Sequence, residues 1–247
     1  MPPALQIVIP VYNEAENFPK LHAALDAAVH EPFRATVVYD FDEDTTIPAV
    51  RCAIEAGDAR FRLLKNSVKR GVVGALLTGF RSVKEGPVLV VMGDLSDDLA
   101  KVDPMVELYR AGWDIVAPSR YTLGGKMIGG PFVKRNLSRW AGRSLRVLRG
   151  LPTSDPTNAF KLYDAEMLHR LQLESDGGFE LSLEITVKAF LAGYRITQIP
   201  ATWSDRTSGE SRFRLWHWLP KYLRWYFYAF RPKHERTRTL AARSPAA

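Results

Sequence analysis

Three aspartates follow a short apolar run near the middle of the chain. The run, Val88–Met92, is unbroken and rich in valine, which is typical of a strand buried on both faces of a parallel sheet. Gly93 ends it, and Asp94, Asp97 and Asp98 follow within five residues. Because ligands of open α/β sheets bind beyond the carboxyl ends of the strands, these carboxylates are expected at a ligand-binding edge.

Like charges at this spacing repel one another unless a divalent cation or cationic side chains offset them. Carboxylate oxygens suit Mg²⁺ or Mn²⁺, and these ions commonly carry the phosphates of a substrate. The cluster therefore indicates a site for a metal ion with a phosphorylated ligand. The alternative is a solvated acidic turn in which an aspartate caps the next helix.

Strands alternate with helices over the first half of the chain. Strands are predicted at residues 5–11, 35–39, 61–65, 88–92 and 114–118, and helices at residues 15–29, 46–57, 71–84 and 101–111. This alternation predicts βαβ units and a mostly parallel sheet. Beyond residue 118 the pattern predicts a glycine-rich loop at 124–130, a basic amphipathic helix at 132–148, a strand at 159–163, a helix at 181–192 and a strand at 194–203.

The chain of 247 residues is long enough for one large α/β domain or two small ones. Its content of 46% hydrophobic and 25% charged residues is that of a globular protein. A single cysteine, Cys52, excludes a disulfide framework and a thiolate metal cluster. The first residues have no signal-peptide pattern, and no apolar run approaches the roughly 20 residues that span a bilayer, so a cytoplasmic setting is expected.

The net charge of +7 is concentrated near the C-terminus. Residues 206–247 contain ten Lys or Arg and two Glu, whereas the preceding 205 residues contain 24 basic and 25 acidic side chains. The C-terminal segment is therefore expected to meet an anionic surface. Nucleic acid is not the expected partner, because the rest of the chain is slightly acidic and has no nucleic-acid reading motif.

Aromatic residues are dense just before the C-terminus, with nine of them in residues 213–230. Trp and Tyr favour the headgroup zone of a bilayer and basic residues favour anionic lipid, so an amphipathic helix lying on a membrane is predicted at 213–232. Pro220 either begins or bends this helix. The alternative is a helix packed on the body of the protein or on a second subunit of a homodimer. Residues 233–247 are expected to be a basic, disordered tail.

Four stretches together resemble family-2 glycosyltransferases of the GT-A fold, and most closely the dolichol- or polyprenyl-phosphate mannose (sugar) synthases. They are residues 9–14 (Ile-Pro-Val-Tyr-Asn-Glu), the acidic run 40–44, the cluster at Asp94, and residues 205–212 (Asp-Arg-Thr-Ser-Gly-Glu-Ser-Arg). Shorter matches at residues 69–71, 119–121, 154–157 and 178–180 fall between them in the family order. The resemblance covers roughly residues 5–215.

The resemblance implies a Rossmann-like GT-A domain at residues 1–212, with the amphipathic aromatic helix behind it. It implies an inverting transferase that moves a hexose, of mannose or glucose type, from a nucleotide-diphosphate sugar to a polyprenyl or dolichyl phosphate. Such an enzyme would act peripherally at the inner membrane face. Two other hypotheses are a family-2 enzyme with a soluble or polysaccharide acceptor, and a non-catalytic nucleotide-sugar binding protein.

The family motifs also assign roles to individual residues. The donor-binding positions are Pro10, Tyr12, Glu14, Asp40, Asp42, Lys69, Arg70, Gly71, Arg206 and Arg212. The family's metal motif is D-x-D, whereas this chain has Met92-Gly93-Asp94, so one carboxylate is missing. Asp94 is the expected ligand of Mg²⁺ or Mn²⁺, with Asp97 or Asp98 supplying a second ligand directly or through water.

On the acceptor side, Arg120, Arg135 and Ser138 match family positions near the acceptor phosphate. A phosphate monoester is already an anion near pH 7, so its attack needs cations that orient it and no general base. Asp155 lies where other inverting family-2 enzymes have a catalytic base. The Ser-Asp-Pro-Thr run around it resembles the sequence of the polyprenyl-phosphate subgroup of the family, and this favours a site-organising role for Asp155.

Overall fold

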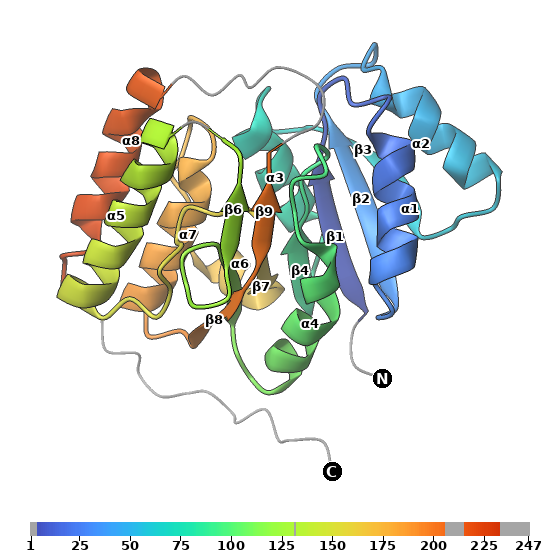
Figure 1. The fold of residues 1–247 in the computed structure, drawn as a ribbon. Helices are drawn as coiled ribbons and strands as arrows, with labels where there is room; N and C mark the ends of the chain where they lie inside the picture. The colour runs from blue at the N-terminus through green and yellow to red at the C-terminus, as the bar shows by residue number, and fades with distance from the viewer. Residues whose placement is uncertain (1–3, 131, 206–214, 233–247) are drawn as a thin grey trace.

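The computed structural model describes residues 4–130, 132–205 and 215–232. Within these residues a seven-stranded sheet has the order β3-β2-β1-β4-β7-β5-β8 (Figure 1). Its strands are β1 (Leu5–Pro10), β2 (Phe33–Tyr39), β3 (Phe61–Lys65), β4 (Pro87–Val90), β5 (Ile115–Ser119), β7 (Lys161–Asp164) and β8 (Ile196–Pro200). Every pairing is parallel except those of β7, which runs antiparallel to β4 and β5. The predicted mostly parallel α/β sheet is confirmed.

Two helical layers cover the sheet because successive side chains of a strand point to opposite faces. Val8 and Val88 join one hydrophobic cluster, whereas Ile7 and Leu89 join the other. The first cluster is covered by α3 (Val72–Arg81), α6 (Ala165–Arg170) and α7 (Glu180–Leu191). The second is covered by α1 (Phe18–Ala28), α2 (Thr46–Glu55) and α4 (Val102–Arg110), with a 3-10 turn at Leu99–Lys101 before α4. Both faces of the central strands are therefore buried.

Two further helices, α5 (Phe132–Arg149) and α8 (Leu215–Tyr228), lie side by side outside the first layer (Figure 1). Trp225 of α8 is 1% exposed, and the Lys188 ammonium lies 4.8 Å from its ring centroid. The hydroxyl groups of Ser144 and Tyr226 join α5 to α8 at 2.9 Å. The predicted C-terminal helix is thus present, and its inner face belongs to the hydrophobic core. Pro220 lies within it.

The second half of the chain differs from the sequence prediction in three places. The expected glycine-rich loop contains β6 (Lys126–Ile128), which pairs in parallel with β9 (Thr202–Ser204). The single strand predicted at 194–203 is therefore two strands, β8 and β9, and Pro200 ends the first of them. Helix α6 was not predicted at all. The small sheet holds the chain after β5 against the segment that leads to residue 205.

The sheet topology brings several loops to one edge. Because β1 to β5 run in the same direction, the segments that follow them all leave the sheet at its carboxyl edge. The antiparallel strand β7 begins at that edge, so the loop before Lys161 lies there too. Residues predicted to bind donor, metal and acceptor are consequently neighbours in space although they span more than 140 positions of the sequence.

Candidate active site

The turn after β1 carries the residues expected to hold a nucleoside. Pro10 is buried at the end of the strand, whereas Tyr12 is 44% exposed, with its ring centroid 5.3 Å from that of Phe41. The Glu14 carboxylate accepts a hydrogen bond from Asn17 Nδ2 at 2.6 Å. An exposed aromatic ring and a carboxylate thus lie at the carboxyl edge, and these groups can stack on a base and accept from a ribose hydroxyl.

Asp44 ties this turn to the one after β2, a role that the sequence analysis did not assign. It is 1% exposed and accepts hydrogen bonds from Asn13 N (3.1 Å), Thr46 N (2.8 Å) and Thr46 Oγ1 (2.6 Å). Asn13 has φ of 56°, in the left-handed region that non-glycine residues rarely adopt, so the contact holds a strained turn in place. The Asp-Thr-Thr run was a usable signal, because an aspartate commonly accepts from the N–H two residues on.

Asp40 links the second strand to the N-terminus of α3. Its Oδ2 accepts from Gly71 N at 2.8 Å, and its Oδ1 accepts from Asn66 Nδ2 at 2.7 Å. Gly71 has φ of 110° at the helix start, where a side chain would strain the backbone. Lys69 donates to the carbonyl oxygen of Asp176 at 2.5 Å. The expected donor residues Asp40, Lys69 and Gly71 therefore form one connected group at a helix N-terminus, which favours anions.

The other expected donor residues have different surroundings. Asp42 forms an exposed ion pair with Lys65 at 2.5 Å, and the Arg70 guanidinium lies 5.9 Å from the Phe41 ring centroid. Arg206 and Arg212 lie outside the described residues, so their predicted contact with the donor diphosphate stays a prediction.

The turn after β4 separates the three aspartates by their partners. Asp97 accepts from Met92 N at 2.8 Å, Asp98 accepts from Thr202 N at 3.0 Å, and Asp94 accepts from the N–H two residues on at 3.2 Å. Across the described ranges, no three or more His, Cys, Asp or Glu side chains are grouped as metal ligands would be. Asp94 is the residue that would hold a cation here, and a second ligand from Asp97 or Asp98 stays a prediction.

Asp97 is a half-buried residue whose carboxyl group accepts a hydrogen bond from the backbone. Burial raises its pKa to about 8; the Met92 N–H and the charge of Arg120 act in the opposite direction, while Asp94 and Asp98 add to the rise. A carboxyl group of this kind is largely protonated at neutral pH unless a cation restores its charge. The hydrogen bond that Asp97 accepts from the Met92 N–H shapes the turn that carries Asp94.

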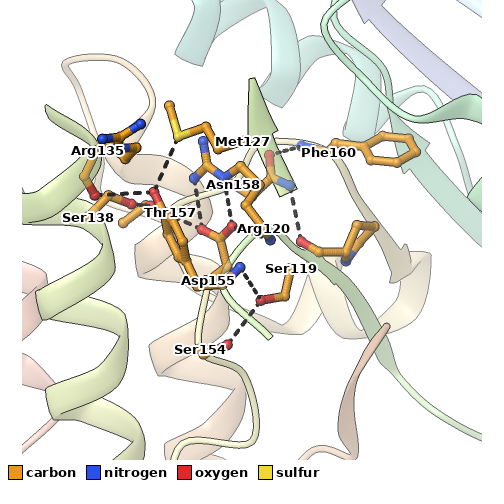
Figure 2. A network of polar contacts seen from close by, with 12 residues as sticks. Ser119, Arg120, Met127, Arg135, Ser138, Ser154, Asp155, Thr157, Asn158 and Phe160 are labelled. Atoms are coloured by element: carbon orange, nitrogen blue, oxygen red, sulfur yellow. Dashed lines mark hydrogen bonds and ion pairs between the residues drawn. The ribbon is translucent and has the colours of Figure 1, made fainter. Parts of the chain in front are cut away.

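Arg120 and Asp155 form a buried two-point ion pair at the end of β5 (Figure 2). Asp155 is fully buried; its Oδ2 accepts from Arg120 Nε (2.7 Å) and backbone N (3.0 Å), and its Oδ1 accepts from Arg120 Nη2 (2.8 Å). Burial alone would raise the pKa of Asp155, but the charge and hydrogen bonds of Arg120 outweigh it and hold the pKa below its usual value. Asp155 is therefore an ionised partner of Arg120, and both of its oxygens are engaged.

Ser138 and Arg135 of α5 lie beside this pair (Figure 2). Ser138 Oγ is 2.6 Å from Thr157 Oγ1, two residues after Asp155. The carbonyl oxygen of Arg135 accepts from Tyr121 Oη at 3.4 Å, and the Arg135 guanidinium lies 5.4 Å from the Phe132 ring centroid. The structure thus brings the predicted acceptor residues to one place from β5, α5 and the loop before β7.

Lys161 lies beneath this loop and was not identified from the sequence. It is fully buried and donates to the carbonyl oxygens of Pro156 (3.0 Å) and Asn158 and to Ser182 Oγ (2.7 Å). Burial lowers its pKa to about 7, while Asp155 raises it and Arg120 lowers it. A lysine inside a predicted apolar strand was the available signal, since lysine is rarely buried without a reason.

The chain is similar to known glycosyltransferases in sequence and in fold. A family model described as glycosyl transferase family 2 matches residues 6–172. The chain is 32% identical to an undecaprenyl-phosphate mannosyltransferase of Micrococcus luteus, over 83% of this chain and 85% of that protein. It is 28% identical to a dolichol-phosphate mannosyltransferase of Pyrococcus furiosus, over 85% of this chain and 59% of that protein.

Among solved structures, the chain resembles glucosyl-3-phosphoglycerate synthase from Mycobacterium tuberculosis, crystallised with Mn²⁺, UDP and glucosyl-3-phosphoglycerate. The TM-score is 0.65 at 17% identity, over 92% of this chain and 78% of that one. At this identity the likeness shows the fold, which is GT-A. The family match extends over most of the chain and includes the turns that carry Pro10, Asp40, Asp94 and Arg120. The protein therefore belongs to glycosyl transferase family 2 and is a glycosyltransferase.

Proposed function

We propose that this glycosyltransferase moves a hexose, of mannose or glucose type, from a nucleotide-diphosphate sugar to a polyprenyl phosphate, with inversion at the anomeric carbon. The turns after β1, β2 and β3 would hold the nucleoside and the diphosphate. The lipid phosphate would approach from the side of α5, near Arg120, Arg135 and Ser138. The names of the similar mannosyltransferases support both substrates.

The observation that supports a phosphate acceptor is that both carboxylate oxygens of Asp155 already accept hydrogen bonds from Arg120. A hydroxyl acceptor needs a base to remove its proton, whereas a phosphate monoester already carries the attacking anion near pH 7. Both oxygens of Asp155 accept hydrogen bonds from Arg120, and the low pKa of this carboxylate makes it a weak base. The site is accordingly better suited to orient an anion than to deprotonate a hydroxyl group.

Mg²⁺ or Mn²⁺ would supply charge neutralisation of the donor diphosphate when bound. Asp94 is the residue that would hold it, at the carboxyl end of β4 and on the donor side of Arg120. The turn is preset for this task, because Leu95 adopts φ of 62° directly after Asp94 and Asp97 fixes the backbone N–H of Met92. Lys69 and the N-terminus of α3 add positive charge on the same side.

A membrane surface is the proposed location of the acceptor, and we name the surface that would meet it the α5–α8 face. Its exposed apolar side chains are Phe132, Val133, Leu137, Trp140, Val147, Leu148, Leu223, Phe227 and Phe230. The exposed arginines Arg139, Arg143, Arg146 and Arg224 lie on the same two helices. Apolar side chains flanked by arginine are what an anionic bilayer surface binds. No helix of the described residues is long and apolar enough to span a membrane.

Transfer assays with a panel of labelled nucleotide sugars test the proposed reaction. Polyprenyl phosphate is the acceptor, and each sugar is tried with Mg²⁺, with Mn²⁺ and with EDTA. We expect a glycosyl phospholipid of inverted anomeric configuration with one or few donors, and only with a metal ion. Transfer to a soluble or polysaccharide hydroxyl acceptor, with none to the lipid phosphate, would contradict the proposal.

The α5–α8 face predicts binding to anionic vesicles. Arg143→Glu is expected to reduce co-sedimentation with phosphatidylglycerol vesicles several-fold, because each basic residue near an anionic surface contributes about 1 kcal/mol and reversal removes more than one such contribution. Arg51→Glu makes the same charge change on an exposed position of α2 and should leave vesicle binding unchanged. Phe227→Ser should weaken the binding that persists at high salt.

Deleting residues 213–247 would test membrane binding less cleanly than these substitutions. Trp225 and Ala229 are each 1% exposed, so removal of α8 would open the core.

Equal vesicle binding by the wild type and by Arg143→Glu would contradict the membrane assignment. A dimer in sedimentation velocity that Phe227→Ser dissociates would instead indicate that a second copy covers this face.

A further inference from the structure

The loop of residues 153–158 is the point at which the acceptor side is assembled. Asp155 pairs with Arg120 after β5, and Thr157 contacts Ser138 of α5. Ser154 adds hydrogen bonds to Ser119 (3.0 Å) and, through its backbone N, to Gln198 of β8 (2.9 Å). Figure 2 shows Ser119, Arg120 and Ser138 next to residues of this loop. A shift of this loop would move Arg120 and Ser138 relative to each other.

Lys161, the first residue of β7, is a buried cation that holds this loop through hydrogen bonds to its backbone. Its Nζ donates to the carbonyl oxygens of Pro156 and Asn158, which flank Thr157 on both sides. The third hydrogen bond goes to Ser182 Oγ of α7, which is fixed in the first helical layer. The three acceptors are neutral, so none offsets the cost of burying an ammonium group as a carboxylate would.

We propose that Lys161 is a positioning residue of the transfer reaction: it fixes the loop carbonyls on either side of Thr157 and thereby holds Ser138 and Arg120 in the arrangement that receives the acceptor phosphate. This inference rests on the proposed function. An apolar side chain at position 161 would fill the same buried space at lower cost, but it would leave the two loop carbonyls to share the single hydroxyl proton of Ser182. The loop would then be linked to α7 by that hydroxyl alone.

Because the charge of Lys161 changes with pH, the proposal predicts that the KM for polyprenyl phosphate depends on pH. Its pKa of about 7 lies in the working range, and the charged groups that face it are Asp155 and Arg120, which stay ionised at these pH values. Below this pKa the ammonium donates to both carbonyls and to Ser182 Oγ, and the Ser182 hydroxyl proton is free to donate to the same carbonyls. Above it the neutral amine accepts from the Ser182 hydroxyl, so that hydroxyl no longer donates to the loop. The KM for polyprenyl phosphate is therefore expected to rise between pH 6 and pH 8.5, while the Kd of the nucleotide sugar stays constant.

Lys161→Met tests the assignment. We expect the KM for polyprenyl phosphate to rise on the order of tenfold, with a smaller change in kcat and an unchanged donor Kd. The rise of KM with pH should disappear in this variant, because no titrating group remains at position 161. A purely structural lysine would lower the melting temperature but would not remove the pH dependence of one KM.

A double-mutant cycle with Thr157→Val separates positioning from general destabilisation. If Lys161 acts through Thr157, the two changes should raise KM together by little more than either does alone. Should Lys161→Met fail to fold, Ser182→Ala carries the test. It removes, without changing charge, the hydroxyl that accepts from the ammonium and donates to the same two loop carbonyls. It should raise the acceptor KM several-fold, again with an unchanged donor Kd.

The possible outcomes are distinguishable. A folded Lys161→Met or Ser182→Ala variant with wild-type acceptor KM and an unaltered pH profile overturns the role of Lys161 while leaving the proposed function intact. Equal increases in donor Kd and acceptor KM would also overturn it, because they indicate a general loosening of the fold. Absence of transfer to polyprenyl phosphate by the wild-type protein overturns both.

Discussion

Asp94→Asn is expected to lower the rate of transfer by roughly a hundredfold to a thousandfold while leaving the protein folded. Asp94 is the carboxylate that we propose to hold a cation against the donor diphosphate, and asparagine keeps its shape without its charge. The leaving diphosphate would then develop charge that no bound cation offsets. Initial rates with labelled nucleotide sugar and polyprenyl phosphate measure the loss, and a thermal melt checks the fold.

Asp114→Asn is the matched control for this variant. Asp114 precedes β5 at the opposite edge of the sheet, where its carboxylate accepts from Arg195 N at 2.7 Å. Asparagine can still accept that hydrogen bond, so activity should stay near the wild-type value. Full activity of Asp94→Asn, or wild-type activity undiminished in excess EDTA, would contradict the metal-dependent reaction.

The first half of the fold could be predicted because its strands are short, mostly apolar runs that alternate with helical patterns. Strand β3 was predicted with its observed bounds, and β1 and β2 were predicted within two residues at each end. Burial on both faces makes such runs easy to recognise. The run at Val88–Met92 was also correct as a strand, although the pairing ends at Val90 because the chain turns to bring Asp97 to the N–H of Met92.

The second half depends on contacts that a local pattern does not contain. Strands β6 and β9 have three residues each and exist through their pairing across 73 intervening residues, so no periodicity marks them. The antiparallel direction of β7 is equally invisible, since an apolar run reads the same in either direction. The antiparallel direction of β7 places Lys161 at its start and Asp155 in the loop before it, both at the carboxyl edge of the parallel strands.

In the candidate site, too, some features could be predicted from the sequence and others could not. The family motifs were enough to assign Asp40, Asp94 and Arg120 to the binding of donor, metal and acceptor, and in the structure each follows a strand that ends at the same edge of the sheet. The partners of these residues were not predictable, since they depend on side-chain directions in the folded state. Asp44 and Asp97 illustrate this, because both belong to acidic runs and yet one ties two turns together and the other shapes the turn before Asp94.

Arg120→Met is expected to destabilise the folded protein by about 3–5 kcal/mol at pH 7, because it leaves Asp155 buried without its partner. Urea denaturation measures the change, and transfer to polyprenyl phosphate should be lost as well. The matched control is Arg60→Met. Arg60 forms a similar two-point pair with Asp58, at 2.8 and 2.6 Å, but its side chain is 39% exposed and Asp58 keeps a contact with His22 at 2.8 Å without it, so its loss should cost only about 1 kcal/mol.

The pH dependence of this loss has a defined sign. In the wild type the pKa of Asp155 is depressed, so its pairing stabilises the fold above the unfolded-state pKa of about 4 and is lost as the pH falls through the lower folded-state value. In Arg120→Met, burial without a partner should raise the pKa of Asp155, and the group then becomes protonated under mildly acidic conditions. The stability gap between wild type and variant should therefore narrow from pH 7 to pH 4. A gap that stays constant over this range would show that Arg120 stabilises the fold through packing, and the doubly substituted Arg120→Met/Asp155→Leu protein would then be no more stable than Arg120→Met alone.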